Sequence, residues 1–215
     1  MKPVHVSILL DRSGSMGSIA DDTVGGFNSF LAKQRAEEGE ARVSLVQFDS
    51  QDPFEVLIDG IPIQEVTDLD RDSYIPRATT PLLDAVGRLI ARCDNDIKSC
   101  SDAGMPEENQ VVVVITDGLE NASREFSRQA IFDLITKRRE QGWVFLFLGA
   151  DQDVWAEGGR FGFSTHDRVA WEKTQKGSEK MWKDLAYSTG EYRRMGESER
   201  SKRRDSFHQE EDSEE

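Results

Sequence analysis

Cysteine and long hydrophobic runs are scarce in this 215-residue chain, which has two cysteines, Cys93 and Cys100. Two cysteines cannot supply the disulfide framework of a small secreted domain, so we expect inert thiols in a reducing compartment. The longest aliphatic run, residues 111–115, is far too short to span a membrane. Apolar and polar side chains alternate over residues 4–8, and the segment runs straight into Asp11, which indicates a strand and not an export signal. We therefore expect a cytoplasmic protein without a membrane partner.

Positive charge and histidine are also in short supply. The chain has 27 Lys and Arg against 41 Asp and Glu, a formal net charge of −14. Binding to nucleic acid requires a basic face that displaces counterions from phosphates, so we expect no nucleic-acid partner. His5, His166 and His208 are too scattered in the sequence to predict a transition-metal site.

Apolar runs alternate with helical periodicity, a pattern typical of an α/β fold with a mostly parallel sheet and helices on both faces. A short polar turn before residue 54 leaves no room for a crossover, so the second and third strands should form an antiparallel hairpin at the sheet edge. The most apolar strand should be central. The predicted strands are residues 4–10, 42–49, 54–58, 111–115, 143–148 and a weak strand at 168–171.

Helical spacing and capping residues predict the helices between these strands. One helix should begin near Pro81, and another should be capped by Ser127. A short helix at residues 154–161 should be broken at Gly158 and Gly159. We expect a domain over residues 1–195, ending in a helix, and a charged, disordered tail over residues 196–215.

The residues with the clearest chemistry follow the ends of predicted strands. Asp11, Ser13 and Ser15 alternate in the loop after the first strand, where Gly14 permits a tight turn. In an open α/β sheet, such loops meet at the carboxyl edge, where ligands bind. The alternation can direct three oxygen-bearing side chains at one point, as a hard cation requires.

Two further segments should reach the same edge. Thr80 stands before the helix near Pro81, with Thr79 as an alternative, and Asp117 ends the most apolar strand. The sequence therefore predicts a cation site of two carboxylates and three hydroxyls from Asp11, Ser13, Ser15, Thr80 and Asp117.

Over roughly residues 4–190 the chain resembles the von Willebrand factor type A domain, in particular its metal-ion-dependent adhesion site. The family pattern is Asp-x-Ser-x-Ser after the first strand, a Thr in a middle loop and an Asp that ends the central strand. The Ser-Gly-Ser-Met, Thr-Pro-Leu and Thr-Asp-Gly-x-Glu-Asn segments are similar to those of compact bacterial and phage intracellular members.

This resemblance implies a Rossmann-like sheet in the order 3-2-1-4-5-6 and a bound Mg²⁺, with Mn²⁺ or Ca²⁺ as alternatives. It also implies a protein partner whose Asp or Glu carboxylate completes the coordination of the metal. Neutral hydroxyl ligands leave positive charge on the ion, so we expect at least one of the two aspartates to act through water or by hydrogen-bonding a serine.

Four other residues fall near the predicted edge. Glu120 and Asn121 follow Asp117 closely, while Asp151 and Asp153 follow the strand at residues 143–148. They are candidates for the rim of the site or for partner contact, and also for helix capping.

Three functions fit these residues. A binding module would dock an acidic side chain through the cation, and we expect this function and no enzyme activity. A metal-dependent hydrolase of phosphoesters or esters would use Asp11, but Ser13 stands where dehalogenase-type phosphatases have a second Asp, and Ser15 lacks a Gly-x-Ser-x-Gly elbow. A regulatory partner of an ATPase or of a stress-response assembly would take nucleotide hydrolysis from another protein, because this chain has no phosphate-binding P-loop.

Overall fold

Six strands form one sheet in the order β3-β2-β1-β4-β5-β6 in the computed structural model, which describes residues 2–211. Neighbouring strands are parallel except β3, which pairs antiparallel with β2 at the edge. The predicted fold class and strand order are therefore confirmed. The strands are β1 (Val4–Asp11), β2 (Ala41–Phe48), β3 (Glu55–Pro62), β4 (Asn109–Thr116), β5 (Val144–Ala150) and β6 (Arg168–Trp171).

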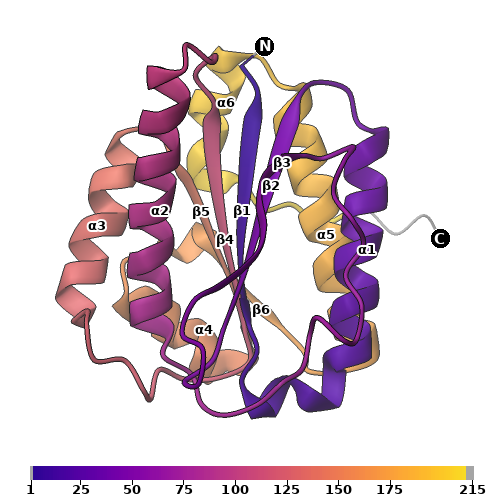
Figure 1. Ribbon diagram of the computed structural model, residues 1–215, viewed down its shortest axis with the longest axis vertical. Helices are drawn as coiled ribbons and strands as arrows, with labels where there is room; N and C mark the ends of the chain where they lie inside the picture. Colours follow the sequence, from indigo (N-terminus) through magenta and orange to yellow (C-terminus); the bar gives the residue numbers. More distant parts are fainter. Residues whose placement is uncertain (1, 212–215) are drawn as a thin grey trace.

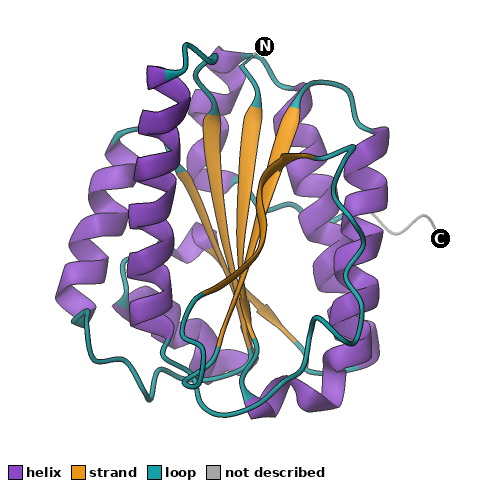
Figure 2. Ribbon diagram, viewed as in Figure 1, coloured by secondary structure: helices purple, strands orange, loops and turns teal. Residues whose placement is uncertain are grey.

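Helices cover both faces of the sheet (Figure 1, Figure 2). On one face, α1 packs against α5, and Phe27, Phe30 and Trp182 form an aromatic cluster between them. On the other face, α2 and α3 pack beside one another over a second apolar core. The helices are α1 (Ala20–Ala36), α2 (Leu82–Asp102), α3 (Arg128–Glu140), α4 (Asp151–Arg160), α5 (Gln175–Arg194) and α6 (Glu197–Arg203), with short 3₁₀ turns η1 (Gly14–Ile19), η2 (Thr165–Asp167) and η3 (Arg204–Ser206).

The central strands carry almost no exposed surface. Every residue of β1 is buried, and β4 is buried from Gln110 to Thr116. Parallel strands covered on both faces read as continuous apolar runs, which is why the pattern of residues 111–115 identified a central strand. Their carboxyl ends lie at the lower edge of Figure 1, so the residues that follow them share one edge of the molecule.

Two sequence predictions differ from the structure. Helix α4 starts at Asp151 and continues through Gly158 and Gly159. A Cβ on Gly158 would lie 2.6 Å from Phe147 Cδ1 in β5, and a Cβ on Gly159 would lie 2.4 Å from the Arg168 guanidinium in β6, so both glycines let the helix approach the sheet. The tail is not disordered over residues 197–211. There, Arg200 is 2% exposed and donates to the carbonyl oxygens of Lys2, Tyr192 and Arg193, and Phe207 packs on Tyr192. Residues 212–215 of that prediction lie outside the described residues.

The two cysteines are free and lie on α2. Seven residues of α-helix rise by about 10.5 Å, more than the roughly 7 Å that a disulfide can bridge. Cys93 and Cys100 therefore cannot pair within this helix. Among residues 2–211, no helix has both the length and the apolar composition needed to cross a bilayer.

Adjacent glycines in α1 give a test of this packing. A Cβ on Gly26 would lie 2.0 Å from Cδ1 of the buried Trp182, whereas a Cβ on Gly25 would meet nothing within 4 Å. Gly26→Ala should therefore lower the free energy of unfolding by about 2 kcal/mol or more, through overpacking between α1 and α5. Gly25→Ala should raise it by about 0.5–1 kcal/mol through helix propensity. Urea unfolding measures both, and equal effects would contradict the described contact.

Candidate metal centre

Three loops meet at the carboxyl edge of the sheet. The loop after β1 donates the Gly14 N–H to the Ala78 carbonyl oxygen at 3.1 Å, which joins it to the segment before α2. Ala78 has a φ of 58°, in the left-handed region that is uncommon for residues other than glycine. The loop after β4 joins the same segment where the Asn121 N–H donates to the Thr80 carbonyl at 3.2 Å. Residues far apart in sequence are thereby fixed side by side.

Asp11 ends β1 with its side chain buried, at 0% exposure. One carboxylate oxygen accepts the backbone N–H of Ser13 at 2.6 Å, and the other accepts the hydroxyl of Thr116 at 2.6 Å. Burial raises the pKa of Asp11 to about 6, although these hydrogen bonds oppose the shift. Asp11 therefore shapes the loop after β1 by hydrogen bonding.

Two serines connect this loop to Asp117. Ser13 Oγ lies 3.1 Å from Ser15 Oγ, and Ser15 Oγ donates to Asp117 Oδ1 at 2.7 Å. The Asp117 side chain is 0% exposed, and its Oδ2 has no hydrogen-bond partner of regular geometry among the described residues. Instead, Oδ2 faces the ammonium group of Lys173 at 2.5 Å. A buried carboxylate oxygen is stabilised by a cation beside it, and here the cation is the lysine side chain.

Thr80 lies on the same side of the site as Asp11. A Cβ added to Gly118 would stand 2.9 Å from Thr80 Oγ1 and 3.6 Å from Asp11 Oδ2, so Gly118 keeps this space open between the two oxygens. Thr80 is 2% exposed. Thr79 is exposed and pairs with Ser50 through its backbone, which favours Thr80 as the candidate threonine.

The assembled groups fit a hard divalent cation. Two carboxylates and three hydroxyls supply only oxygen donors, the type that Mg²⁺, Mn²⁺ and Ca²⁺ accept. Asp117 and Gly118 are neighbours in the loop after β4, so the buried Oδ2 of Asp117 and the space between Thr80 and Asp11 belong to the same loop. Ser13, Ser15, Thr80 and Asp117 would contact the ion or its waters. Asp11 would hold in place the loop after β1 that carries Ser13 and Ser15, which we call the serine loop.

A buried ionic network supports the serine loop from behind. Arg12, inside the Asp-x-Ser-x-Ser segment, is 4% exposed and donates to Asp49 at 2.8 Å and to Glu55 at 2.5 Å. Arg77 also donates to Asp49, at 3.0 Å. The hydroxyl of the buried Tyr74 donates to the Asp11 carbonyl oxygen at 2.7 Å. These contacts fix the loop backbone, so the site oxygens are ordered by the protein.

Among the flanking candidates, Glu120 and Asn121 accept hydrogen bonds from backbone groups around the site. Glu120 accepts hydrogen bonds from the backbone N–H groups of Leu83, Ala122 and Ser123, and therefore stabilises the start of α2. Asn121 Oδ1 accepts the Thr80 N–H at 3.0 Å. Both residues are thus positioning residues in this structure.

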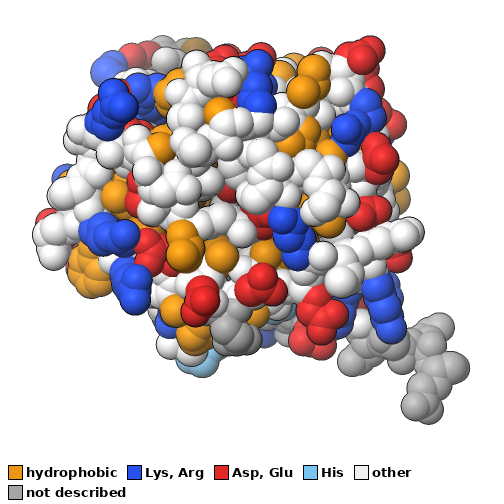
Figure 3. Space-filling view, turned by 90° about the horizontal axis from the view of Figure 1, so that it is seen from below, with side chains coloured by type: hydrophobic (Ala, Val, Ile, Leu, Met, Phe, Trp, Pro, Cys, Tyr) orange, Lys and Arg blue, Asp and Glu red, His pale blue; other side chains and the backbone are white. Residues whose placement is uncertain are grey.

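Asp151 and Asp153 behave differently and are exposed in the first turn of α4. They lie on the same edge as the site, where they are available for partner contact or for interaction with the helix dipole. Figure 3, which looks onto this edge, shows acidic and basic side chains intermixed, with hydrophobic side chains between them.

Sequence reasoning missed four residues of the site region. Thr116 directly precedes Asp117, and Arg12 lies between Asp11 and Ser13. Their positions in the motifs could have marked them as candidates, but sequence alone did not indicate which groups they contact. Tyr74 and Lys173 lie in connecting segments, and their positions depend on the packing of the whole sheet edge.

Comparison with solved structures assigns the fold. The vWF domain of the type V pili tip protein Mfa5 from Porphyromonas gingivalis matches 91% of this chain and 98% of its own length, with a TM-score of 0.61 and 12% identity. A von Willebrand factor type A structure from Catenulispora acidiphila matches 88% of this chain and 43% of its own length, with a TM-score of 0.54 and 12% identity. The chain has the von Willebrand factor type A fold.

A third structure with this fold carries a metal. Proximal thread matrix protein 1 from the mussel byssus, with a zinc-occupied MIDAS motif, matches 86% of this chain and 48% of its own length, with a TM-score of 0.57 and 16% identity. The chain spans less than half the length of several structures that it matches. Neither protein-family models nor curated proteins give a match to the sequence.

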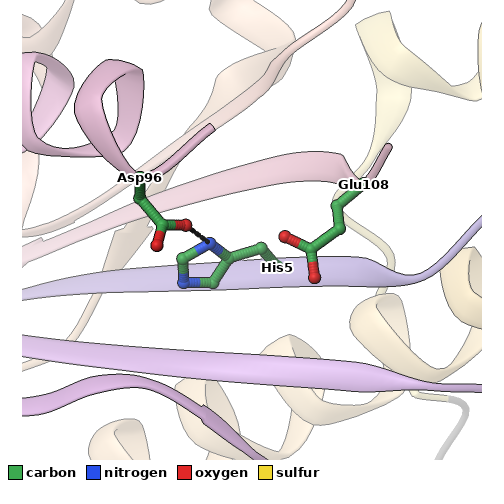
Figure 4. A group of neighbouring side chains, drawn as sticks. All are labelled: His5, Asp96 and Glu108. Atoms are coloured by element: carbon green, nitrogen blue, oxygen red, sulfur yellow. Dashed lines mark ion pairs between the residues drawn. The ribbon is translucent and has the colours of Figure 1, made fainter. Parts of the chain in front are cut away.

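A second group of metal-type ligands lies at the opposite end of the sheet (Figure 4). His5, Asp96 and Glu108 each offer one ligand atom within 4.8 Å of the others, a proximity that sequence spacing did not reveal. The Arg42 guanidinium already binds both carboxylates, at 2.7 Å from Asp96 and 2.6 Å from Glu108. His5 Nδ1 faces Asp96 at 3.3 Å, and His5 Nε2 lies 2.9 Å from Ser44 Oγ. Arg42 therefore makes this group a closed ionic cluster.

The buried carboxylate of Asp11 predicts a stability cost. In EDTA at pH 7, Asp11→Asn should raise the free energy of unfolding by about 3 kcal/mol, because a carboxylate with a folded-state pKa of about 6 is ionised at the expense of stability. The folded parent binds more protons than the unfolded chain between pH 6 and pH 4, so the parent gains stability there and the difference should shrink toward pH 4. Urea unfolding across pH measures this.

Asp49→Asn is the matched control. Burial alone would raise the pKa of Asp49, but hydrogen bonds from the backbone N–H groups of residues 52 and 51 and from the Arg77 side chain, together with the charge of Arg12, lower it. Removing this carboxylate should therefore destabilise the protein at pH 7. A loss of stability in Asp11→Asn at pH 7 would contradict the electrostatic account of Asp11.

Proposed function

We propose that this chain is a protein-binding module that holds a divalent cation on Ser13, Ser15, Thr80 and Asp117, with Asp11 as the organising residue. The cation then binds an Asp or Glu carboxylate of a partner protein. The observation that carries the proposal is the buried Asp117 carboxylate, whose Oδ2 has only a cationic neighbour while Oδ1 is tied to the serine pair.

The chemistry of the ligand set supports binding of an acidic group. Hydroxyl oxygens donate no net charge, and both Asp11 oxygens already accept short hydrogen bonds, so the bound ion would keep much of its positive charge. An ion with residual charge at the edge of a rigid sheet attracts a carboxylate. We propose Mg²⁺ as the cation, with Mn²⁺ or Ca²⁺ as substitutes. The zinc-occupied MIDAS motif of the mussel byssus protein, on the same fold, supports a metal at this edge.

We do not propose hydrolysis. Asp11 would be the nucleophile of the enzymatic alternative, but its side chain is 0% exposed and both of its oxygens accept hydrogen bonds at 2.6 Å. A nucleophile needs an accessible lone pair in line with its substrate. A cytoplasmic location remains part of the proposal, and an ATPase as the protein partner remains the alternative that the sequence left open. Two free cysteines, one of them buried, support a reducing compartment.

Thermal unfolding in EDTA and then with Mg²⁺, Mn²⁺ or Ca²⁺ tests the metal site. A ligand that binds only the folded state stabilises it by about 2.7 kcal/mol at a hundred times its dissociation constant. For a domain of this size, the melting temperature should rise by roughly 5–10 °C. Asp117→Ala should abolish this rise, while Asp153→Ala, which removes an exposed acid from the same edge, should keep it. A parent protein that does not respond to saturating cation would contradict the proposal.

Selection from a peptide display library tests the acidic partner. With the protein immobilised in Mg²⁺, peptides eluted by EDTA should each contain an Asp or Glu whose replacement by Asn or Gln lowers affinity at least ten-fold. The metal–carboxylate bond supplies this difference, because an amide carries no charge to attract the ion. Peptides that bind equally well in EDTA, or to the Asp117→Ala variant, would contradict carboxylate docking.

A further inference from the structure

Lys173 lies inside the proposed metal site, although it belongs to none of the three loops that form it. Its ammonium group is 2.5 Å from Asp117 Oδ2 and donates to the Ser15 carbonyl oxygen at 2.5 Å. The lysine thus bridges the serine loop after β1 and the aspartate after β4. Its side chain is 27% exposed, and its carboxylate partner is fully buried.

The turn that carries Lys173 is held on both sides. Trp171, at the end of β6, is 6% exposed and donates its indole N–H to the Leu148 carbonyl oxygen at 3.2 Å. Thr174 caps α5 by accepting the Gly177 N–H at 3.1 Å. With these two anchors, the backbone of Lys173 is fixed beside the site, and only the lysine side chain is free to leave it.

We propose that Lys173 is a built-in competitor of the divalent cation: its ammonium group neutralises Asp117 in the metal-free protein and must leave when the cation binds. This inference rests on the proposed metal site. It adds a regulatory element, because the affinity for the cation then depends on a side chain outside the ligand set.

Charge balance makes the competition necessary. Asp117 carries one negative charge, and the Lys173 ammonium group already neutralises it. Arg12 adds no uncompensated charge, because it is paired with Asp49 and Glu55. An ammonium group retained on Asp117 beside a dication would therefore leave surplus positive charge in a largely desolvated place, where like charges repel strongly.

The same contacts pair a buried carboxylate with a cation of the chain itself. An ionised carboxylate that is fully buried is costly unless it is paired. Lys173 supplies the pairing for Asp117 from the chain itself. Any process that removes the charge of Lys173, such as acylation of its amine, should then favour the cation-bound form.

Titration of Mn²⁺ by isothermal calorimetry tests the competition. Lys173→Met should bind Mn²⁺ roughly ten-fold more tightly than the parent, within the usual range of coupling between two ligands. Lys173→Arg, which keeps a tethered cation, should bind like the parent. Lys98→Met is the matched control. It removes the same charge from an exposed lysine that pairs with Asp102 near the C-terminal end of α2, far from the site, and should leave the affinity for Mn²⁺ unchanged.

Amine labelling of the parent protein gives a second measurement that needs no variant. Mass spectrometry after brief acylation should show that saturating Mn²⁺ increases the labelling rate of Lys173 several-fold and leaves that of Lys98 unchanged. Reciprocity requires this result: if Lys173 weakens the binding of Mn²⁺, then bound Mn²⁺ must weaken the contact of Lys173 with Asp117 by the same factor.

The outcomes separate this inference from the proposed function. If the parent binds Mn²⁺ and Lys173→Met binds it equally or more weakly, the competition is overturned and the metal site stands. If labelling of Lys173 is unchanged or lower in Mn²⁺, the competition is likewise overturned. If neither the parent nor Lys173→Met binds Mn²⁺, both proposals fall.

Discussion

Two buried carboxylates at the ends of neighbouring strands are the constraint on which the rest of this structure depends. Asp11 ends β1 and Asp117 follows β4, and the parallel pairing of these strands brings both acids to one edge. Burial and like charge make such a pair unfavourable unless donors or cations stand beside it. The hydroxyls of Thr116 and Ser15, the N–H of Ser13 and the ammonium of Lys173 all serve this requirement.

The loops around the site are built to hold these donors still. Arg12 ties the serine loop to the end of β2 through Asp49, and Glu120 and Asn121 tie the loop after β4 to the start of α2. Each of these contacts joins segments that are distant in sequence. Hydrogen bonds within the protein thus hold the oxygen groups in place, which would reduce the free energy lost in ordering them on binding.

Much of the architecture was predictable because the sheet is buried on both faces. The continuous apolar run at residues 111–115 indicated a central strand, and the short turn before residue 54 indicated the antiparallel edge. The motif residues could be assigned to one edge because parallel strands end together. Thr80 was separated from Thr79 only by burial, which the sequence does not encode locally.

What could not be predicted depends on contacts across the whole fold. Composition pointed to disorder after residue 196, yet Arg200 binds three backbone carbonyl groups and Phe207 packs on Tyr192. A helix break at Gly158 was expected from propensity, but close approach to Phe147 requires glycine there. The sequence around Lys173 contains no motif that predicts its contact with Asp117. That contact depends on where the fold places the turn after β6.

Counting bound Mn²⁺ by electron paramagnetic resonance tests the central claim most directly. The free-ion signal disappears on binding, so a titration of the parent gives the number of sites per chain. The account predicts one tight site in the parent and none in the Ser13→Ala, Ser15→Ala double variant, which should remain folded because both side chains lie in the loop after β1 and outside the strands. A parent with no site, or a double variant that retains it, would contradict the account.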